Sequence, residues 1–252
     1  MPELPEVEII RRQLGRVLVG QRIKKVKVRE KRSWQGKAEE VEGKKIVKIG
    51  RKAKVLIIEL ENRKYLLIHL KMTGQLIYDK KSQIKHIRVV FELDKGRLFF
   101  NDMRLFGWIK VVDGEGMKKE FSKFGPDVIS KEFTAEYLGK ALMGSGRAVK
   151  LVLMDQAKMG GVGNIYANDI LFCAGIDPRK TARKIGKDKR TMKRLYKCLR
   201  KVIEAGIKYR GKYQEHFLVY EREGEKCNKC KGKIKKIKLG GRGTYYCSKC
   251  QV

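Results

Sequence analysis

Apolar residues near the start of the chain recur with the period of an α-helix. They fall three or four positions apart and form one stripe, at Leu4, Val7, Ile10 and Leu14. Pro5 suits the first helical turn, where its missing N–H costs no hydrogen bond. Glu6 and Glu8 complement the positive end of the helix dipole. The pattern therefore predicts a helix from about residue 4.

From about Val17 to Val112 the pattern changes to short apolar runs typical of strands. Polar turns such as Asp94-Lys95-Gly96 separate the runs. The clearest runs lie at 23–28, 55–58, 65–68, 87–91 and 97–100. Runs of this length and spacing favour an antiparallel β-sandwich.

The spacing becomes helical again from about Ala135 to Arg210, with breaks at Asp177-Pro178 and Gly186. Residues 113–134 contain several glycines and a proline, and this composition is typical of a connector. A short β-rich tail follows the helical region. The fold class predicted from these patterns is α+β.

Composition and charge identify the kind of partner. The 252 residues are 42% hydrophobic, and 61 Lys+Arg against 28 Asp+Glu give a net charge of +33. This excess of positive charge indicates that the binding partner is a polyanion. An anionic membrane would attract the same charge, but no long basic amphipathic helix with an aromatic face is present, so nucleic acid is favoured. With no run of eighteen apolar residues and no apolar signal region, we expect a soluble, cytoplasmic protein.

The basic residues are concentrated in one stretch. Arg179 to Lys201 holds twelve basic residues, and Asp188 is its single acid. A solvated helix face explains part of this run, but the strength of the bias favours contact with phosphates.

Four cysteines near the end of the chain have the spacing of a zinc ribbon. Sixteen residues separate two C-x2-C pairs, and the four thiolates are Cys227, Cys230, Cys247 and Cys250. Two disulfides are the alternative, which a reducing compartment disfavours. We therefore expect one structural Zn²⁺. No acidic residue follows Glu225, so the ribbon is expected to bind phosphate, with Arg242 flanked by glycines. Cys173 and Cys198 lie in apolar helical surroundings and are expected to be buried free thiols.

A glycine-rich turn, Gly160-Gly161-Val162-Gly163, separates two helical stretches. It is not a dinucleotide-binding loop, because no strand precedes it and the glycine spacing differs. The turn can offer backbone N–H groups and the Asn164 amide to a phosphate at the start of the second helix. A tight helix hairpin in a core would give the same pattern.

Pro2 and Glu3 have the chemistry of a nucleophile and a proton shuttle. Removal of Met1 would make Pro2 the N-terminus, and an α-amine titrates near ~8 whereas a lysine titrates near ~10.4, so more of it is unprotonated at neutral pH. The amine is also secondary, so its adduct with an aldehyde carbon is already a cationic iminium. The helix start explains Pro5 but leaves Pro2 without a structural role.

Together these motifs resemble the formamidopyrimidine-DNA glycosylases, whose relatives include endonuclease VIII. The resemblance runs from Met1 to Gln251 and rests on the opening Pro2-Glu3-Leu4-Pro5-Glu6-Val7-Glu8, the segment from Asp155 to Tyr166, and the four-cysteine finger with Arg242. It implies an N-terminal antiparallel β-sandwich with an N-terminal helix, a helix-two-turn-helix domain and a zinc-ribbon finger. The expected limits are 1–113 for the catalytic sandwich, 114–134 for a linker, 135–216 for the helical domain and 217–252 for the finger.

The resemblance implies catalytic roles for four residues. Pro2 attacks C1′ of the damaged nucleotide, displaces the base and forms a Schiff base, while Glu3 handles protons. Lys54 matches a lysine linked to phosphate contact and β-elimination, and Arg242 matches a phosphate ligand linked to the second elimination. Without the family, Lys54 is not distinguished from Lys52.

The resemblance also implies DNA contacts for His69, Met72, His86, Arg104, Phe106 and Asn164. His69 and Asn164 bind phosphates, and His86 contacts DNA. Met72, Arg104 and Phe106 fill the gap that an extruded nucleotide leaves, which recovers part of the stacking and pairing energy. Without the family, His69 would be a satisfied core histidine and Phe106 a core residue.

The chain departs from the family pattern in four places. Leu105 replaces an arginine or lysine, Lys71 a glycine, and Asp169 a glutamate. The connection between Gly206 and Tyr213 is shorter than in typical members. The missing stretch resembles the loop that closes over everted 8-oxoguanine, so the sequence leaves open how strongly this lesion is preferred.

The sequence therefore predicts a bifunctional DNA glycosylase and abasic-site lyase of base-excision repair. It would excise oxidised purines, both formamidopyrimidines and 8-oxoguanine, and nick the strand by β,δ-elimination. Its partner is double-stranded DNA with oxidised bases or abasic sites, and we expect a monomer with no membrane partner. An endonuclease VIII-like preference for oxidised pyrimidines is the alternative within this class, and a non-catalytic binder of damaged or bent DNA is the alternative outside it.

Overall fold

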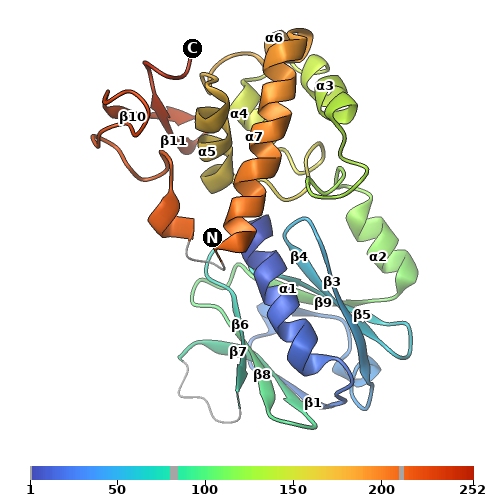
Figure 1. Cartoon of the computed structure of the whole chain (residues 1–252). Helices are drawn as coiled ribbons and strands as arrows, with labels where there is room; N and C mark the ends of the chain where they lie inside the picture. Colours follow the sequence, from blue (N-terminus) through green and yellow to red (C-terminus); the bar gives the residue numbers. More distant parts are fainter. Residues whose placement is uncertain (1, 80–84, 210–212) are drawn as a thin grey trace. The chain divides into compact units, whose positions relative to one another are not determined.

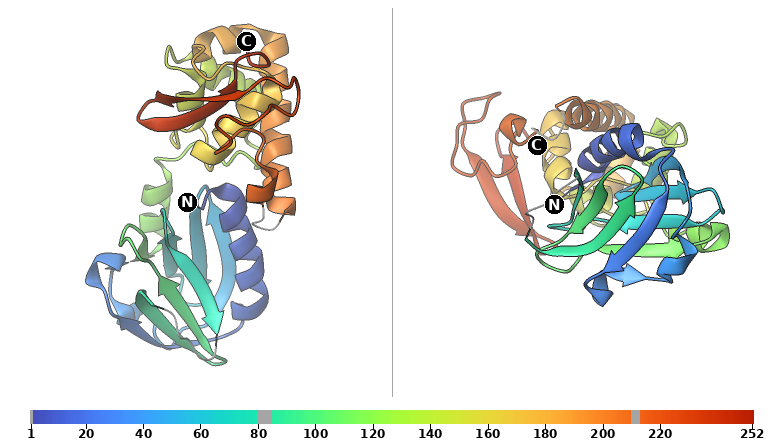
Figure 2. Two further views of the ribbon diagram at one scale, coloured as in Figure 1. Left: turned by 90° about the vertical axis from the view of Figure 1, so that its left-hand side faces the viewer. Right: turned by 90° about the horizontal axis from the view of Figure 1, so that it is seen from below.

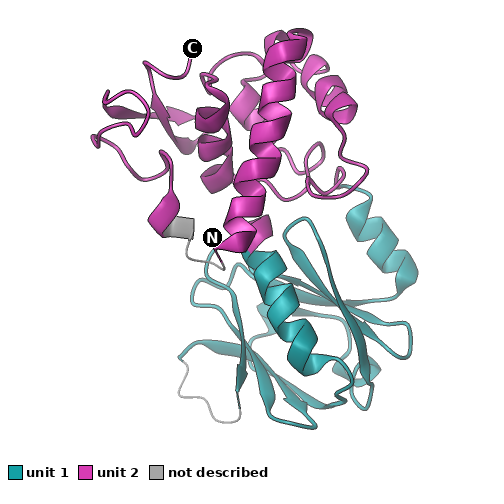
Figure 3. Cartoon of the chain, in the orientation of Figure 1, with its two compact units in different colours: residues 1–2, 6–123 teal, residues 3–5, 124–252 magenta. Residues whose placement is uncertain are grey.

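The computed structural model describes residues 2–79, 85–209 and 213–252. The chain divides into two compact units (Figure 3): unit 1 comprises residues 1–2 and 6–123, and unit 2 comprises residues 3–5 and 124–252. Each unit has its own hydrophobic core. No described helix is long and apolar enough to cross a membrane.

Unit 1 is a β-sandwich (Figure 1). One sheet has the strand order β1-β7-β8-β6 and the other β2-β9-β5-β4-β3. The strands are β1 (Ile23–Val28), β2 (Trp34–Gln35), β3 (Ile46–Lys52), β4 (Val55–Leu60), β5 (Tyr65–His69), β6 (Gln75–Asp79), β7 (Ile87–Leu93), β8 (Arg97–Asn101) and β9 (Trp108–Val112). Neighbouring strands are antiparallel except β2, which runs parallel to β9. The predicted antiparallel sandwich is therefore confirmed, with one short parallel pair.

The predicted N-terminal helix is α1 (Leu4–Leu18). Val7, Leu14 and Leu18 are buried in the core of unit 1 with residues of both sheets. Leu4 instead is buried in the core of unit 2, where the backbone N–H of Leu4 donates to the carbonyl oxygen of Gly161 at 3.2 Å. The first two residues of α1 therefore belong to unit 2, and the rest of the helix to unit 1.

The predicted linker over 114–134 begins with a helix, α2 (Gly114–Phe121). Asp113 caps it, because its carboxylate accepts the backbone N–H of Gly116 at 2.9 Å. The stretch predicted to be a connector therefore contains a helix, since an N-cap and a good first-turn acid, Glu115, outweigh the two glycines.

Unit 2 is helical and ends in a hairpin. Its helices are α3 (Ala135–Met143), α4 (Val149–Leu153), α5 (Asn164–Ala174), α6 (Ala182–Lys187) and α7 (Lys189–Lys208), and its strands are β10 (Ile234–Leu239) and β11 (Arg242–Cys247). Asp188 caps α7, and Gly175 ends α5 in the left-handed region at φ 65°. Figure 2 shows the hairpin of β10 and β11 next to α5. The predicted α+β fold is thereby confirmed.

The two cysteines outside the ribbon are not free. Cys173 of α5 and Cys198 of α7 form a disulfide, with Cα atoms 5.7 Å apart. The prediction of two free thiols is wrong. Twenty-five residues separate the two cysteines, and the packing of α5 against α7 brings them together.

Candidate functional site

The carboxylate of Glu3 lies at the N-terminus of α5. The side chain is fully buried, and its oxygens accept the backbone N–H groups of Gly163 at 2.8 Å, Ile165 at 2.9 Å and Tyr166 at 3.4 Å. The unpaired N–H groups and the positive dipole end of a helix suit an anion. The glycine-rich turn before α5 thus holds the start of the chain in place.

This arrangement corrects one expectation. The sequence predicted that the N–H groups of the glycine-rich turn face a phosphate, but Gly163 donates to Glu3, Gly160 to the carbonyl oxygen of Pro126 and Gly161 to the side chain of Gln156. The turn also needs glycine, because Gly161 has φ 109° and a Cβ there would lie 2.3 Å from Leu4. Pro2, the predicted nucleophile, is half-buried and directly precedes the fixed carboxylate of Glu3 in the chain.

Asn164 and Lys150 both donate hydrogen bonds to one backbone carbonyl near the tip of the finger hairpin. The oxygen of Gly243 accepts from Asn164 Nδ2 at 3.2 Å and from Lys150 Nζ at 3.0 Å, and Lys150 also donates to Thr244 Oγ1 at 2.7 Å. The Oδ1 atom of Asn164 is buried with no partner in the described structure. These bonds hold Arg242, the residue before Gly243, next to the start of α5.

Lys150 is the residue of this cluster that the sequence reasoning missed. Its side chain is fully buried, and burial lowers its pKa to about 7, with the charge of Glu3 raising it and that of Arg242 lowering it further. One lysine among so many carries no signal in the sequence. Its role depends on a hairpin more than ninety residues away.

The hairpin exposes Arg242 through a two-residue turn. Gly240 and Gly241 have φ 55° and 75°, which matches the mirror-image turns that favour glycine at both positions. A Cβ on Gly240 would lie 2.5 Å from the side chain of Leu151, so the tip packs closely on α4. Arg242 itself is exposed and therefore accessible to an anion.

The four ribbon cysteines converge as the spacing predicts. All four Sγ atoms lie within 4.8 Å of one another, with Cys227 to Cys250 at 3.7 Å and Cys230 to Cys247 at 3.4 Å. Four sulfurs about 2.3 Å from one tetrahedral zinc would be about 3.8 Å apart, so the set fits this ion. The four cysteines would hold one structural Zn²⁺, which fixes the two ends of the finger.

In unit 1, His69 is the last residue of β5. Across the sheet it pairs with Val55, the residue that follows Lys54 in the chain. Lys54 is buried in the turn between β3 and β4. Burial, with the nearby charges of Lys71 and Lys54, lowers the pKa of His69 to about 3, so the ring is neutral at pH 7. Its Nδ1 accepts the backbone N–H of Lys71 at 2.9 Å. The proton therefore lies on Nε2, which can donate to a phosphate oxygen.

The three residues predicted to fill the extrusion gap lie together. The guanidinium of Arg104 sits 4.9 Å from the ring centre of Phe106, and its Nη1 is 3.4 Å from Met72 Sδ. Met72 and Phe106 are 42% and 52% exposed, which is unusual for apolar side chains of this size and excludes a core role for Phe106. The cluster presents an apolar and cationic edge to solvent.

A buried aspartate to which the sequence analysis assigned no role organises this loop. Asp102 is fully buried, bonds the hydroxyl of Thr73, and accepts the backbone N–H groups of Arg104 at 3.2 Å and Gly107 at 2.7 Å. It thereby links the segment of Met72 to that of Arg104 and Phe106. Leu105, between them, adopts φ 59°.

Two further positions show backbone strain. Lys71 adopts φ 51°, in the left-handed region that glycine adopts more readily than other residues. His86 is exposed, adopts φ 68° and immediately precedes β7, and its carbonyl oxygen accepts the N–H of Asp102 at 3.1 Å. His86 is thus tied to the same loop as Arg104.

Asp169 of α5 anchors the segment that follows the shortened connection. Its buried carboxylate accepts the N–H groups of Leu218 and Val219 at 3.0 Å and of Tyr220 at 3.3 Å. The shortened connection itself includes residues 210–212, which lie outside the described residues.

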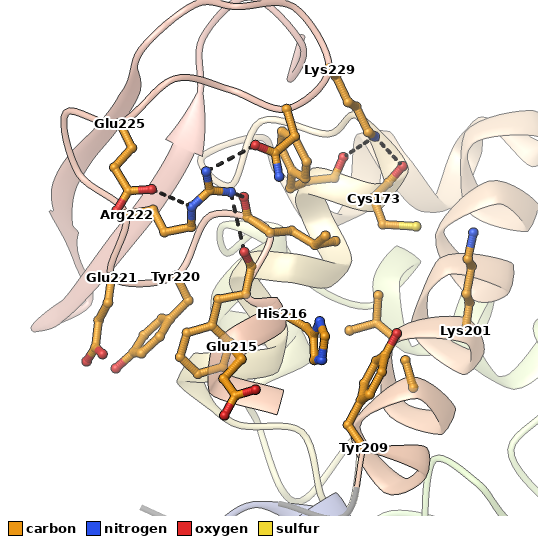
Figure 4. A pocket seen from close by; sticks show the side chains of 16 residues that line it. Cys173, Lys201, Tyr209, Glu215, His216, Tyr220, Glu221, Arg222, Glu225 and Lys229 are labelled. Atoms are coloured by element: carbon orange, nitrogen blue, oxygen red, sulfur yellow. Dashed lines mark hydrogen bonds and ion pairs between the residues drawn. The ribbon is translucent and has the colours of Figure 1, made fainter. Parts of the chain in front are cut away.

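A cavity of about 1030 Å³ lies between α5, α7 and residues 215–229 (Figure 4). None of the predicted site residues lines it. Several of its charged groups are engaged: Arg222 pairs with Glu225 at 2.8 Å, and Lys229 Nζ donates to the carbonyl oxygen of Phe172 at 3.0 Å. The cavity is therefore separate from the site built around Glu3.

Comparison with known proteins covers almost the whole chain. Residues 1–109 match the formamidopyrimidine-DNA glycosylase N-terminal domain, residues 124–217 its H2TH domain, and residues 224–252 the zinc finger found in FPG and IleRS. A formamidopyrimidine-DNA glycosylase of Pelotomaculum thermopropionicum is 38% identical over 275 aligned positions, which cover 100% of this chain and 99% of the relative.

Solved structures of the Lactococcus lactis enzyme are also similar. Its complex with DNA containing an AP site has a TM-score of 0.94 at 31% identity, with 99% of each chain covered. Its complex with DNA containing an oxidised pyrimidine has a TM-score of 0.93 at the same identity and coverage. On its sequence, its fold and these matches, the chain belongs to the formamidopyrimidine-DNA glycosylase family.

Proposed function

We propose that this chain removes oxidised purines from duplex DNA through Pro2 and then cleaves the strand at the resulting abasic site. DNA glycosylase and abasic-site lyase activity in base-excision repair is the activity of the family to which the chain belongs. The observation that carries the assignment to Pro2 is the buried Glu3 carboxylate, which three backbone N–H groups hold one residue along the chain.

The chemistry begins at the nitrogen of Pro2 after Met1 is removed. The lone pair attacks C1′ of the damaged nucleotide, the bond from C1′ to the base breaks, and the base leaves with a proton. Opening of the sugar ring gives an iminium between Pro2 and C1′. Glu3 is fixed close to this nitrogen along the chain, and so is suited to give and take the protons.

The iminium then makes strand cleavage possible. It acidifies the C2′ hydrogen, whose loss expels the 3′ phosphate in β-elimination. A second elimination expels the 5′ phosphate, and water releases the sugar fragment and restores the amine of Pro2. Lys54, His69, Asn164 and Arg242 would hold the flanking phosphates, Lys54 and Arg242 as cations and His69 as a neutral donor.

Access to C1′ requires the nucleotide to leave the helix stack. Met72, Arg104 and Phe106 lie together on an exposed edge and would occupy the vacated space, with Arg104 facing the orphaned base. His86 would contact the DNA backbone near the same loop. With chromosomal DNA as its substrate, the protein would act in the cytoplasm at the nucleoid.

A second candidate is excision of oxidised pyrimidines. The relative from Lactococcus lactis has been crystallised with DNA that contains an oxidised pyrimidine, and the shortened connection after Gly206 would permit such a base. A non-catalytic DNA binder is disfavoured, because such a protein would not need the buried carboxylate of Glu3 beside Pro2.

Borohydride trapping on an abasic duplex tests the proposal. We expect wild type to form a covalent complex, and Pro2→Gly to lower trapping by at least about 100-fold while duplex affinity changes little. Pro5→Ala, a change in the same segment that leaves the N-terminal residue intact, is the matched control and should still be trapped. Undiminished trapping of Pro2→Gly would show that the secondary amine of Pro2 is not required and would refute this assignment.

A further inference from the structure

The long helix α7 carries one stripe of exposed cations along its length. Its members are Arg190, Lys193, Arg194, Lys197, Lys201 and Lys208, all exposed. They recur at intervals of three, four and seven residues, so they share one face of the helix. From Arg190 to Lys208 the stripe is about 27 Å long at 1.5 Å per residue.

The stripe is separate from the site built around Glu3. The opposite face of α7, with Leu195, Leu199 and Ile203, is buried in the core of unit 2. That face packs against α5, whose first residue is Asn164. The cations therefore lie on the side of α7 opposite these core residues, and Lys201 also borders the cavity beside Cys173 of α5.

Neighbouring acids act on these cations only through their charge: Lys193 helps to lower the pKa of Glu136, and Arg194 that of Asp188. None of the six forms an ion pair with a described carboxylate. Of the two acids on or next to α7, Glu204 pairs with Arg200 at 3.5 Å, and Asp188 caps the helix through the N–H groups of Arg190 and Thr191. The stripe is therefore a continuous positive surface and not a set of surface ion pairs.

The placement of the charges also opposes the stability of the helix. Arg190 and Arg194, and Lys193 and Lys197, stand four residues apart on one face, where like charges repel. Arg190 and Lys193 lie near the N-terminal end of α7, which the helix dipole makes positive. An arrangement that is unfavourable in the free protein becomes favourable once a polyanion covers it.

We propose that this face of α7 is a second binding surface for duplex DNA, which holds an undamaged segment apart from the one that carries the lesion. Duplex DNA presents one negative charge per about 1.7 Å of its axis. A straight duplex can therefore place phosphates along the whole row of cations on α7. A membrane is a poor partner, because the apolar face of α7 is buried and leaves nothing to insert. The surface would let the protein hold one segment while searching another.

A bridging experiment tests this. A short duplex with an uncleavable abasic-site analogue is immobilised, the protein is bound to it, and capture of a labelled undamaged duplex is measured over a range of salt concentrations. The test variant carries Arg190→Gln, Arg194→Gln, Lys197→Gln and Lys201→Gln, which keep good helix formers. The control carries Lys25→Gln, Lys37→Gln, Lys45→Gln and Lys48→Gln, exposed positions of unit 1, and removes the same charge.

We expect wild type and control to capture the second duplex and the α7 variant to capture at least about 10-fold less, with a shallower salt dependence. Binding to the immobilised duplex and single-turnover excision should be unchanged. Equal capture by all three proteins would show that the stripe is only a solvated face. If the α7 variant lost lesion binding as strongly as capture of the second duplex, the stripe would be part of the lesion-binding surface. Either result overturns the proposal. Failure of wild type to excise any base would refute the proposed function instead, and leaves this binding result intact.

Discussion

Glu3 and Glu8 lie five residues apart, and their environments differ completely. Glu3 binds backbone N–H groups at the start of α5. Glu8 lies in unit 1 among three arginines: it accepts Arg11 at 2.8 and 2.9 Å, Arg12 at 2.8 Å and Arg51 at 3.2 Å. Both carboxylates are almost fully buried, so each depends on its partners for compensation. Glu3 is therefore suited to a role in the functional site, and Glu8 to a structural role.

The pKa of Glu8 leads to a prediction about acid stability. Burial alone would raise this pKa, but hydrogen bonds from Arg11 and Arg12 and the charge of Arg51 lower it to about 2 from 4.5. Because the pKa is lower in the folded state, the carboxylate stabilises the fold above pH 4.5, and this contribution disappears as the pH falls towards 2. Glu8→Gln should therefore cost about 1–3 kcal/mol at pH 7, an amount bounded by the size of the shift.

Denaturant unfolding of wild type and Glu8→Gln at several pH values between 7 and 3 would measure this. The difference between the two proteins should shrink as the pH falls, and loss of zinc in acid affects both alike. Exposed Glu39→Gln serves as the control and should follow wild type throughout. A difference that is constant with pH would mean that the ionised form of Glu8 has no special role.

At the scale of elements, α5 is where the parts of unit 2 meet. Its N-terminus holds Glu3, Asn168 in its middle accepts the N–H of Tyr245 of β11 at 2.8 Å, and Asp169 holds the segment at 218–220. Lys229 of the finger donates to the last carbonyl groups of the same helix. The finger is therefore attached to the helical part through side-chain and backbone bonds as well as through the chain.

Loss of zinc should release the finger from this attachment. We expect one Zn²⁺ per chain by metal analysis, and expect Cys247→Ser to lose it, because three remaining thiolates cannot close the tetrahedral site. Arg242 would then lose its fixed position, and DNA affinity should fall by at least about 10-fold with the sandwich still folded. A gel-shift assay would measure the DNA affinity, and circular dichroism would show whether the sandwich remains folded.

Ser248→Ala, in the same knuckle and exposed, is the matched control. It should retain both metal and affinity. Purified protein that contains no metal yet binds DNA fully would contradict the zinc-ribbon interpretation.

For the whole molecule, the shortened connection after Gly206 bears on lesion choice. The resemblance implies that the missing stretch would close over everted 8-oxoguanine, and the segment after it is held by Asp169. With less of a cap, discrimination of 8-oxoguanine from guanine rests on few hydrogen bonds, each worth about 1 kcal/mol. Formamidopyrimidines differ more from guanine in shape and leave more readily.

We therefore expect ring-opened purines to be excised faster than 8-oxoguanine opposite cytosine, with some activity on oxidised pyrimidines. Single-turnover rates on duplexes that differ in the lesion alone would decide the order. A strong preference for 8-oxoguanine over both other lesions would show that the missing stretch does not govern selectivity in this protein.

Local patterns in the sequence determined the fold class, the helical and strand-rich regions, and the metal site. These features depend on periodicity and on short spacings, and two C-x2-C pairs need little else to converge on one ion. The family resemblance supplied Met72, Arg104 and Phe106, and local reasoning alone would have placed Phe106 in a core. The domain limits and the role of each site residue stay predictions.

Tertiary structure alone decided how distant segments meet. It gave Glu3 the N-terminus of α5, buried Lys150 against the finger, and joined Cys173 to Cys198. It also placed exposed cations of the basic stretch on a single face of α7. These contacts join residues from 25 to more than 150 positions apart, and no local pattern encodes them. Their physical cause is the packing of the helices and the finger hairpin against one another, which fixes buried polar groups only where partners from other elements compensate them.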